Sequence, residues 1–295
     1  MKGHQVPSPQ ASTLPSSFSW PDDRQVAVIA TVAVELWSHG SWPVYAPMAA
    51  AWPLPGAQDT HSVSWAEYGV TTGVWRLLDI LQTKEMRATF GINGLVAERF
   101  PEILRATGGA GHEIAAHSYA QDVLPACLDA AAERANIVRS CDLIEGVTGR
   151  RPTGWMSPRA TGTARTVDLL AQAGLTWSGD FNDADLPYVL HTPYGSVVAI
   201  MHSDVSDVRT PSGPAAYRSL LEQLLGCLLA SGRPQILNLT VHAHVGGRPA
   251  MADAIGRVLD SVQQAGDRVW VATHQQVAEH VLRHTGHATQ RQGAS

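Results

Sequence analysis

The feature that most constrains this chain is an alternation of short apolar runs with amphipathic helical patterns, repeated about seven times. The first run, residues 25–35 (QVAVIATVAVE), is almost continuously apolar and rich in Val, which is typical of a strand buried on both faces. Residues 72–83 then place four apolar side chains at the i, i+3, i+4, i+7 spacing of one helical face. Alternating strands and helices predict a mostly parallel sheet with right-handed crossovers. At 295 residues, a closed or nearly closed barrel is favoured over an open doubly wound sheet.

The same patterns divide the rest of the chain. Further strands are expected in residues 86–92, 112–116, 154–159, 175–180, 196–201, 235–241 and 268–272. Further helices are expected in residues 97–107, 130–147, 163–173, 215–229, 251–264 and 275–283. We therefore predict an N-terminal arm (1–22), one barrel domain (23–285) and a flexible tail (286–295).

The segment after the first strand, residues 37–69, is predicted to be a long loop. It holds four Pro and four Trp, and loops of this length inside a compact domain are usually functional. Because it follows a strand end, it could fold over a site there. The alternative is a surface excursion packed by its own Trp rings.

Composition excludes several function classes. A formal net charge of -5 gives no electrostatic basis for nucleic-acid binding. No apolar run approaches the roughly 20 residues of a membrane span, and the first twenty residues lack the apolar core of a secretory signal. The three cysteines have no ligand-like spacing, so a reducing, cytoplasmic location is expected. No Gly-x-Gly-x-x-Gly follows the first strand, and no phosphate-loop lysine motif occurs.

Polar side chains occupy the ends of the predicted strands. They are Glu35, Asn93, His117, Arg159, Asp180, His202 and His242. Because the carboxyl ends of barrel strands meet at one mouth, where active sites lie, seven such residues together predict an enzyme. Each alone is weak evidence, since strand ends lie near the surface in any case.

These side chains allow hydrolysis. A carboxylate (Glu35) beside imidazoles (His117 and His242) can deprotonate water, or hold a metal that does so, and Arg159 can orient a carboxylate or stabilise charge. No Gly-x-Ser-x-Gly elbow occurs and no cysteine lies beside a candidate base, so covalent catalysis is not supported. We assign Asn93, Asp180 and His202 to substrate binding.

Two further residues are included as substrate-binding candidates, with their alternatives open. Asp183 follows Asp180 in an acidic loop and could simply solvate it. Trp155 lies in a strand pattern, where such a residue is more often core than a platform for a ligand. His244, two residues past His242, is expected to point elsewhere.

Several segments resemble the polysaccharide deacetylase (NodB homology) family, and within it the branch of allantoinases and cyclic imide hydrolases. They are residues 68–78 (YGVTTGVWRLL), 87–93 (RATFGIN), 111–118 (GHEIAAHS), 148–155 (TGRRPTGW), 183–188 (DADLPY) and 242–249 (HAHVGGRP). The resemblance spans about two thirds of the chain. It implies a distorted (β/α)7 barrel and a hydrolase of non-peptide C–N bonds, with carbohydrate metabolism as the family's usual setting.

Two departures from the family's usual motifs concern a metal. Where the family has a pair of Asp residues, one a base and one a metal ligand, this chain offers only Glu35. Where the family has His-(Ser/Thr)-x-x-His, the second imidazole is replaced by Gln121, and an amide oxygen binds zinc poorly. A metal-free site is favoured. The alternative is zinc or another divalent metal held by Glu35 and His117, with His242 as a further donor, and we include Gln121 among the substrate-binding residues.

A metal-free site suits an activated amide better than a sugar N-acetyl group, which benefits from Lewis-acid polarisation. We therefore predict hydrolysis of a small cyclic amide, ureide or imide. The alternatives are a metal-dependent polysaccharide or oligosaccharide N-deacetylase with rearranged ligands, and a decayed barrel that binds an amide or carbohydrate without turnover. Convergence of Glu35 and His117 on one water molecule would argue against decay. The expected partner is a small-molecule substrate, with a homo-oligomer open.

Overall fold

The computed structural model describes residues 10–209 and 213–286. Residues 1–9 of the predicted arm and 287–295 of the predicted tail lie outside this range, and the domain division stays a prediction. The strands are β1 (Gln10–Ser12), β2 (Val26–Val34), β3 (Thr89–Ile92), β4 (Glu113–Ala116), β5 (Gly154–Trp155), β6 (Trp177–Phe181), β7 (Tyr188–Thr192), β8 (Gly195–Met201), β9 (Gln235–His242) and β10 (Val269–Ala272).

Most of these strands form one parallel sheet that curves almost into a barrel. Its order is β1–β7–β8–β6–β5–β4–β3–β2–β10, with β9 also paired to β2. β9 pairs with β2 along nearly its whole length, while β10 pairs with the first half of β2 and β3 with the second half. The β8 and β9 sides are joined by an isolated bridge from Ser206 to Thr240, by a hydrogen bond from the Asn238 amide to the Met201 carbonyl oxygen (3.1 Å) and by hydrogen bonds from His242 to Asp207, and the described residues form no strand ladder there. The sheet is therefore a distorted barrel that is not closed by a full ladder, as expected.

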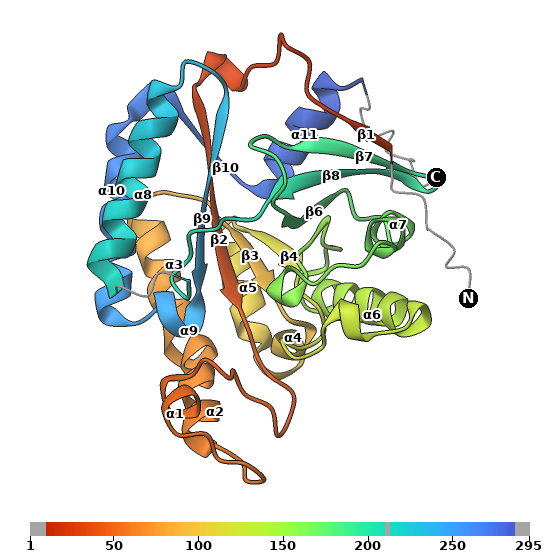
Figure 1. Ribbon diagram of the computed structural model, residues 1–295, viewed down its shortest axis with the longest axis vertical. Coiled ribbons are helices and arrows are strands. Elements are labelled where there is room, and N and C mark those ends of the chain that lie inside the picture. Colours follow the sequence, from red (N-terminus) through yellow and green to blue (C-terminus); the bar gives the residue numbers. More distant parts are fainter. Residues whose placement is uncertain (1–9, 210–212, 287–295) are drawn as a thin grey trace.

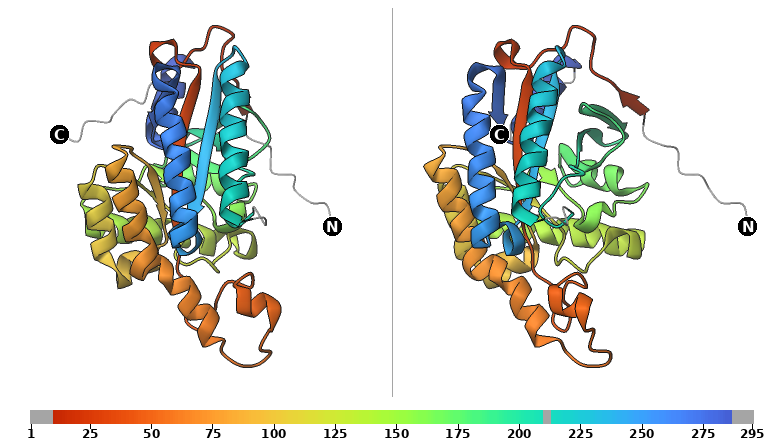
Figure 2. Two further views of the ribbon diagram at one scale, coloured as in Figure 1. Left: turned by 90° about the vertical axis from the view of Figure 1, so that its left-hand side faces the viewer. Right: turned by 60° about the vertical axis from the view of Figure 1, so that its left-hand side comes forward.

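Most of the helices cover the outside of this sheet, while α1 and α2 project beyond it and α11 lies at its base (Figures 1 and 2). They are α1 (Pro47–Ala51), α2 (Thr60–Tyr68), α3 (Val74–Thr83), α4 (Gly94–Arg99), α5 (Pro101–Gly109), α6 (Ala130–Thr148), α7 (Thr166–Gln172), α8 (Gly213–Ala230), α9 (Ala243–Gly246), α10 (Pro249–Gln264) and α11 (His274–His284). Figure 2 shows α8 and α10 running alongside β2 and β9. Among the described residues, no helix combines the length and hydropathy needed to cross a bilayer.

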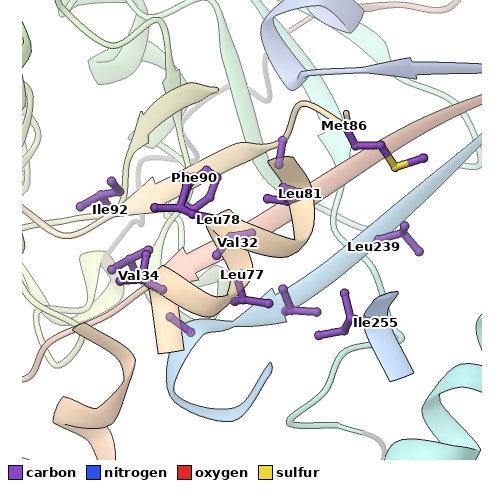
Figure 3. Close-up of a cluster of buried hydrophobic side chains, with 14 of the residues drawn as sticks. Val32, Val34, Leu77, Leu78, Leu81, Met86, Phe90, Ile92, Leu239 and Ile255 are labelled. Atoms are coloured by element: carbon purple, nitrogen blue, oxygen red, sulfur yellow. The ribbon is translucent and has the colours of Figure 1, made fainter. Parts of the chain in front are cut away.

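The period-two geometry of β2 divides its side chains between two environments. Val26, Val28, Val32 and Val34 face outward into the main hydrophobic core. Figure 3 shows Val32 and Val34 beside the leucines of α3. Burial of each such side chain contributes roughly 1.5–3 kcal/mol. The alternate residues face inward, so the inner row of β2 leads toward Glu35 at the strand's carboxyl end.

The base of the barrel, at the amino ends of its strands, is filled by α11. Val277 and Val281 of this helix pack inside the sheet against Ile29. At the same level the Glu113 carboxylate accepts hydrogen bonds from the Trp177 indole (2.9 Å), the Thr89 hydroxyl (2.7 Å) and the backbone N–H of Gln275 (2.9 Å). The amino-terminal end of the barrel is thus closed by apolar packing and by hydrogen bonds to Glu113.

Residues 37–69 are not the continuous loop that we predicted. They contain α1 and α2, which project beyond the carboxyl end of β2 (Figure 1). The Asp59 carboxylate caps α2 by accepting from the Ser62 N–H at 2.9 Å. α2 then continues through a π-helical turn, Gly69–Gly73, into α3. The sequence did not indicate α2, because its N-cap Asp59 and the glycines on either side of it (Gly56 and Gly69) are residues typical of turns.

The strand pattern also missed a hairpin. β7 pairs antiparallel with β8, and β1 pairs with the free edge of β7. We predicted no strand in residues 188–192, although their alternating pattern before Gly195 fits a short edge strand. This hairpin widens the sheet away from the mouth.

Candidate active site

A cavity of 290 Å³ opens at the carboxyl ends of the strands. Seven residues predicted from strand ends or motifs line it: Glu35, His117, Gln121, Arg159, Asp180, His202 and His242. Tyr45 and Arg209, which were not predicted, line it as well. Strand geometry therefore brings most of the predicted residues to one place.

Glu35 lies at the inner end of this cavity and is almost completely buried. Its Oε1 atom is 3.4 Å from the Nε2 atom of His117 and 3.8 Å from that of His242. Burial acts to raise the pKa of Glu35, but the positive charge of His242 and a hydrogen bond from His117 outweigh it and lower the pKa to about 2. Glu35 is therefore a carboxylate at every working pH.

A hydrogen bond on the side away from Glu35 orients the His117 ring. Its Nδ1–H donates to the Met156 carbonyl oxygen at 2.8 Å, and this bond turns the Nε2 atom toward Glu35 Oε1, 3.4 Å away. Asn93 holds the neighbouring strand ends together: its Oδ1 accepts from the Leu36 N–H at 2.9 Å, and its amide donates to the His117 carbonyl oxygen. Asn93 is fully buried and does not line the cavity, so its position indicates support of the site.

His242 is paired with a residue that sequence reasoning missed. Asp207 Oδ1 accepts from the Nδ1–H of His242 at 2.7 Å, and Oδ2 accepts from the His242 backbone N–H at 2.8 Å. Burial acts to lower the pKa of His242, but the charges of Asp207 and Glu35 raise it to about 9. At neutral pH His242 is thus an imidazolium whose Nε2–H faces the cavity side of Glu35. No periodic signal marks Asp207, which lies in the irregular segment after β8.

His244 also lies beside Glu35, contrary to our expectation. β9 ends at His242 and the chain turns into α9, so His244 returns toward the site instead of continuing the strand. Its Nδ1 atom is 3.8 Å from Glu35 Oε2, and its Nε2 atom is 3.0 Å from the Tyr45 hydroxyl. Burial lowers the pKa of His244 to about 4, so the ring is neutral.

The remaining cavity residues surround this centre. Asp180 accepts from the Ser157 N–H (2.6 Å) and hydroxyl (2.5 Å), and burial raises its pKa. Burial, assisted by the charge of Arg209, lowers the pKa of His202 to about 4. Arg159 is exposed at the mouth and adopts a left-handed backbone conformation, φ 57°, which is uncommon for a side chain of this size.

Besides Asn93, two predicted residues lie away from the cavity. The fully buried Trp155 donates its indole N–H to the Ser157 hydroxyl at 2.9 Å and belongs to the core. Asp183 is exposed and accepts from the Tyr188 hydroxyl at 3.0 Å. Both positions match the structural alternatives rather than substrate binding.

The donor set does not fit the metal site of the family pattern. Gln121 stands where a second imidazole would be, and an amide oxygen is a poor ligand for zinc. Within residues 10–209 and 213–286, no group of three or more His, Cys, Asp or Glu side chains is arranged to hold a metal ion. We therefore assign no step to a metal held by Glu35 and His117.

Comparisons with known proteins agree with this fold. Residues 62–178 match the polysaccharide deacetylase family model. A Mycobacterium smegmatis protein assigned as a polysaccharide deacetylase is 31% identical, with 96% of this chain and 98% of the other covered and a TM-score of 0.78. The Puue allantoinase is 26% identical over 92% of this chain and 94% of its own, with a TM-score of 0.81. The peptidoglycan deacetylase of Helicobacter pylori is 29% identical over 47% of this chain and 45% of its own.

These matches confirm the fold and the branch expected from the motifs. The likeness to the M. smegmatis protein covers almost the whole of both chains. This chain belongs to the polysaccharide deacetylase family and is a hydrolase of carbon–nitrogen bonds other than peptide bonds.

Proposed function

We propose that this hydrolase opens a small cyclic amide, ureide or imide by direct attack of water on a ring carbonyl. The observation that carries the proposal is the buried Glu35 carboxylate, with the Nε2 atoms of His117 and His242 at 3.4 and 3.8 Å inside one cavity. A volume of 290 Å³ suits a small molecule, and Tyr45 closes one side, which disfavours an extended polymer. The likeness to an allantoinase over nearly the full length of both chains supports the same reading.

The site contains the groups that such a reaction needs. The Glu35 carboxylate is a proton acceptor at the inner end of the cavity, with His117 Nε2 3.4 Å away, so a water bound beside it is polarised toward the substrate. As the water oxygen bonds to the carbonyl carbon, one water proton passes to Glu35. The C–N bond then breaks, and the Nε2–H of His242 protonates the leaving nitrogen. The net change is the addition of one water across the bond, giving an open-chain acid.

Positive charge is available for the developing oxyanion. Arg159 and Arg209 both line the mouth, and the described residues include no carboxylate within ion-pairing distance of either. Their charges can therefore act on substrate and intermediate instead of being neutralised within the protein.

A substrate panel tests the proposal. Purified protein of measured metal content is incubated, with and without chelator, with hydantoins, cyclic imides and allantoin, and in parallel with N-acetylated sugar oligomers. We expect ring opening that chelator leaves unchanged. Acetate release from the sugars, lost on chelation and without ring opening, would instead establish a metal-dependent deacetylase. Tight binding of a ring without turnover would indicate a decayed barrel.

A further inference from the structure

Tyr45 connects the projecting α1–α2 segment with the active site. Among the described residues of that segment, it alone lines the cavity. Neighbouring apolar side chains on the segment are exposed, including Trp52 at 70%. The exposed tip of the segment is therefore not held in place by its own burial, and Tyr45 supplies the segment's hydrogen bond to His244.

The partner of Tyr45 is itself immobile. His244 is fully buried, with the rings of Trp37 and Trp65 edge-on to it at 5.6 and 5.1 Å. Its backbone lies against the π-helical turn: a Cβ added at Gly69 would be 2.9 Å from the His244 nitrogen. Glycine is thus required there, and π-helical turns are frequent at functional sites. The His244 ring can change its proton position but not its place.

The hydrogen bond from Tyr45 determines which nitrogen of His244 carries the proton. The Tyr45 hydroxyl lies 3.0 Å from Nε2 of the neutral His244 ring, and donation of the hydroxyl proton to Nε2 requires the ring proton on Nδ1. The ring proton is then on Nδ1, which faces Glu35 Oε2 at 3.8 Å. Within the described chain, neither Nδ1 nor Oε2 has a hydrogen-bond partner. The opposite tautomer would place a lone pair against the carboxylate.

We propose that Tyr45 is a positioning residue that holds His244 in the Nδ1–H tautomer and so turns an N–H toward Glu35 when the α1–α2 segment lies over the mouth. The position of the α1–α2 segment over the cavity is thereby coupled to the stabilisation of the negative charge on Glu35. Oε2 is stabilised from the His244 side, and Oε1 is left to His117 and water. This inference rests on the proposed role of Glu35 in hydrolysis.

The test is Tyr45→Phe, which keeps the ring and removes only the hydroxyl, with Tyr194→Phe on the exposed β7–β8 turn as the matched control. Histidine ¹⁵N spectra, with His244 assigned through its loss in His244→Asn, report the tautomer directly. We expect Nδ1–H in the native protein and in the control, and a mixed tautomer in Tyr45→Phe. With a ring substrate, kcat should fall roughly tenfold to a hundredfold with little change in KM.

The two measurements separate two failures. An Nε2–H tautomer in the native protein, or an unchanged His244 signal in Tyr45→Phe, overturns the inference even if ring hydrolysis is established. An unchanged kcat in Tyr45→Phe also overturns it. The expected spectra together with no hydrolysis of any ring would overturn the proposed function, and with it the coupling, while the tautomer assignment would stand.

Discussion

Two inward-facing glutamates of the same barrel have opposite surroundings. Glu113, at the base, is held by neutral donors: an indole, a hydroxyl and a backbone N–H. Glu35, at the mouth, faces three imidazoles, and its Oε2 has no hydrogen-bond partner among the described residues. Burial raises the pKa of Glu113, whereas histidine charges and hydrogen bonds overcome burial and lower that of Glu35.

The difference shows how one barrel separates stability from reactivity. Neutral donors satisfy Glu113 and fasten α11, so nothing about this carboxylate is left for chemistry. The imidazoles around Glu35 keep it ionised, and its Oε1 atom, beside His117 and His242 in the cavity, is the oxygen proposed to act on water. Burial alone therefore does not identify a catalytic carboxylate. The charge of the neighbouring side chains, and whether they leave an oxygen of the carboxylate available, distinguish Glu35 from Glu113.

The largest expected effect is that of Glu35→Gln. The amide cannot accept a proton from water, so kcat for ring hydrolysis should fall about a thousandfold, within the usual range for a general acid–base group. Activity and thermal unfolding should be measured together, because folding is expected to persist. A variant that retains more than a tenth of native kcat would contradict the catalytic role.

Asp207→Asn should change both rate and pH dependence. In the native protein, activity should decline above about pH 9, where His242 loses the proton that it gives to the leaving nitrogen. Without the Asp207 charge, burial dominates, so this decline should move to lower pH and kcat should fall roughly tenfold to a hundredfold. Asp204→Asn, at an exposed position after β8, is the control. An alkaline limb that stays in place would show that Asp207 does not set the charge of His242.

Glu113→Gln should have the reverse pattern, a stability loss without a catalytic one. Its amide group faces donors, so we expect a loss of about 1–3 kcal/mol in denaturant unfolding and kcat within twofold of native. Because the folded pKa of Glu113 is raised, its carboxyl contributes most below the unfolded value of 4.5 and less as pH rises. The deficit should therefore be larger at pH 4 than at pH 7. A fall in kcat with unchanged stability would contradict the assignment of a structural role to Glu113 and a catalytic role to Glu35.

The smallest effect is expected for Arg159→Ala. This residue is exposed and solvated, so loss of its charge should raise KM about three- to tenfold and lower kcat less. Arg105→Ala, at an exposed position on α5, provides the control in steady-state kinetics. An unaltered kcat/KM would place Arg159 outside substrate recognition.

The residues that sequence analysis located share one physical basis. Glu35, His117 and His242 each follow an apolar strand, and parallel strands end at the same mouth, so a local pattern carries their position. The assignment of their roles stays a prediction until the variants are measured. The (β/α) alternation likewise predicted most of the sheet.

The residues that were missed lack such a basis. His244 depended on whether β9 continued or turned into a helix, a choice made by packing against Gly69. Tyr45 reaches His244 across 199 residues of sequence, and no local pattern encodes a contact of that separation. Gln121, by contrast, was located by its place in the family motif, although the motif could not show that its amide oxygen has no hydrogen-bond partner among the described residues.

The pairing of β2 has a consequence for how the chain folds. Val26 at its start pairs with Gln235 on one side and Val269 on the other. During synthesis this apolar strand therefore emerges long before either partner exists, and most of its edges stay unpaired until the last part of the chain has been made. We expect slow folding, set by closure of very long loops, and aggregation of C-terminally truncated chains even when every catalytic residue is retained.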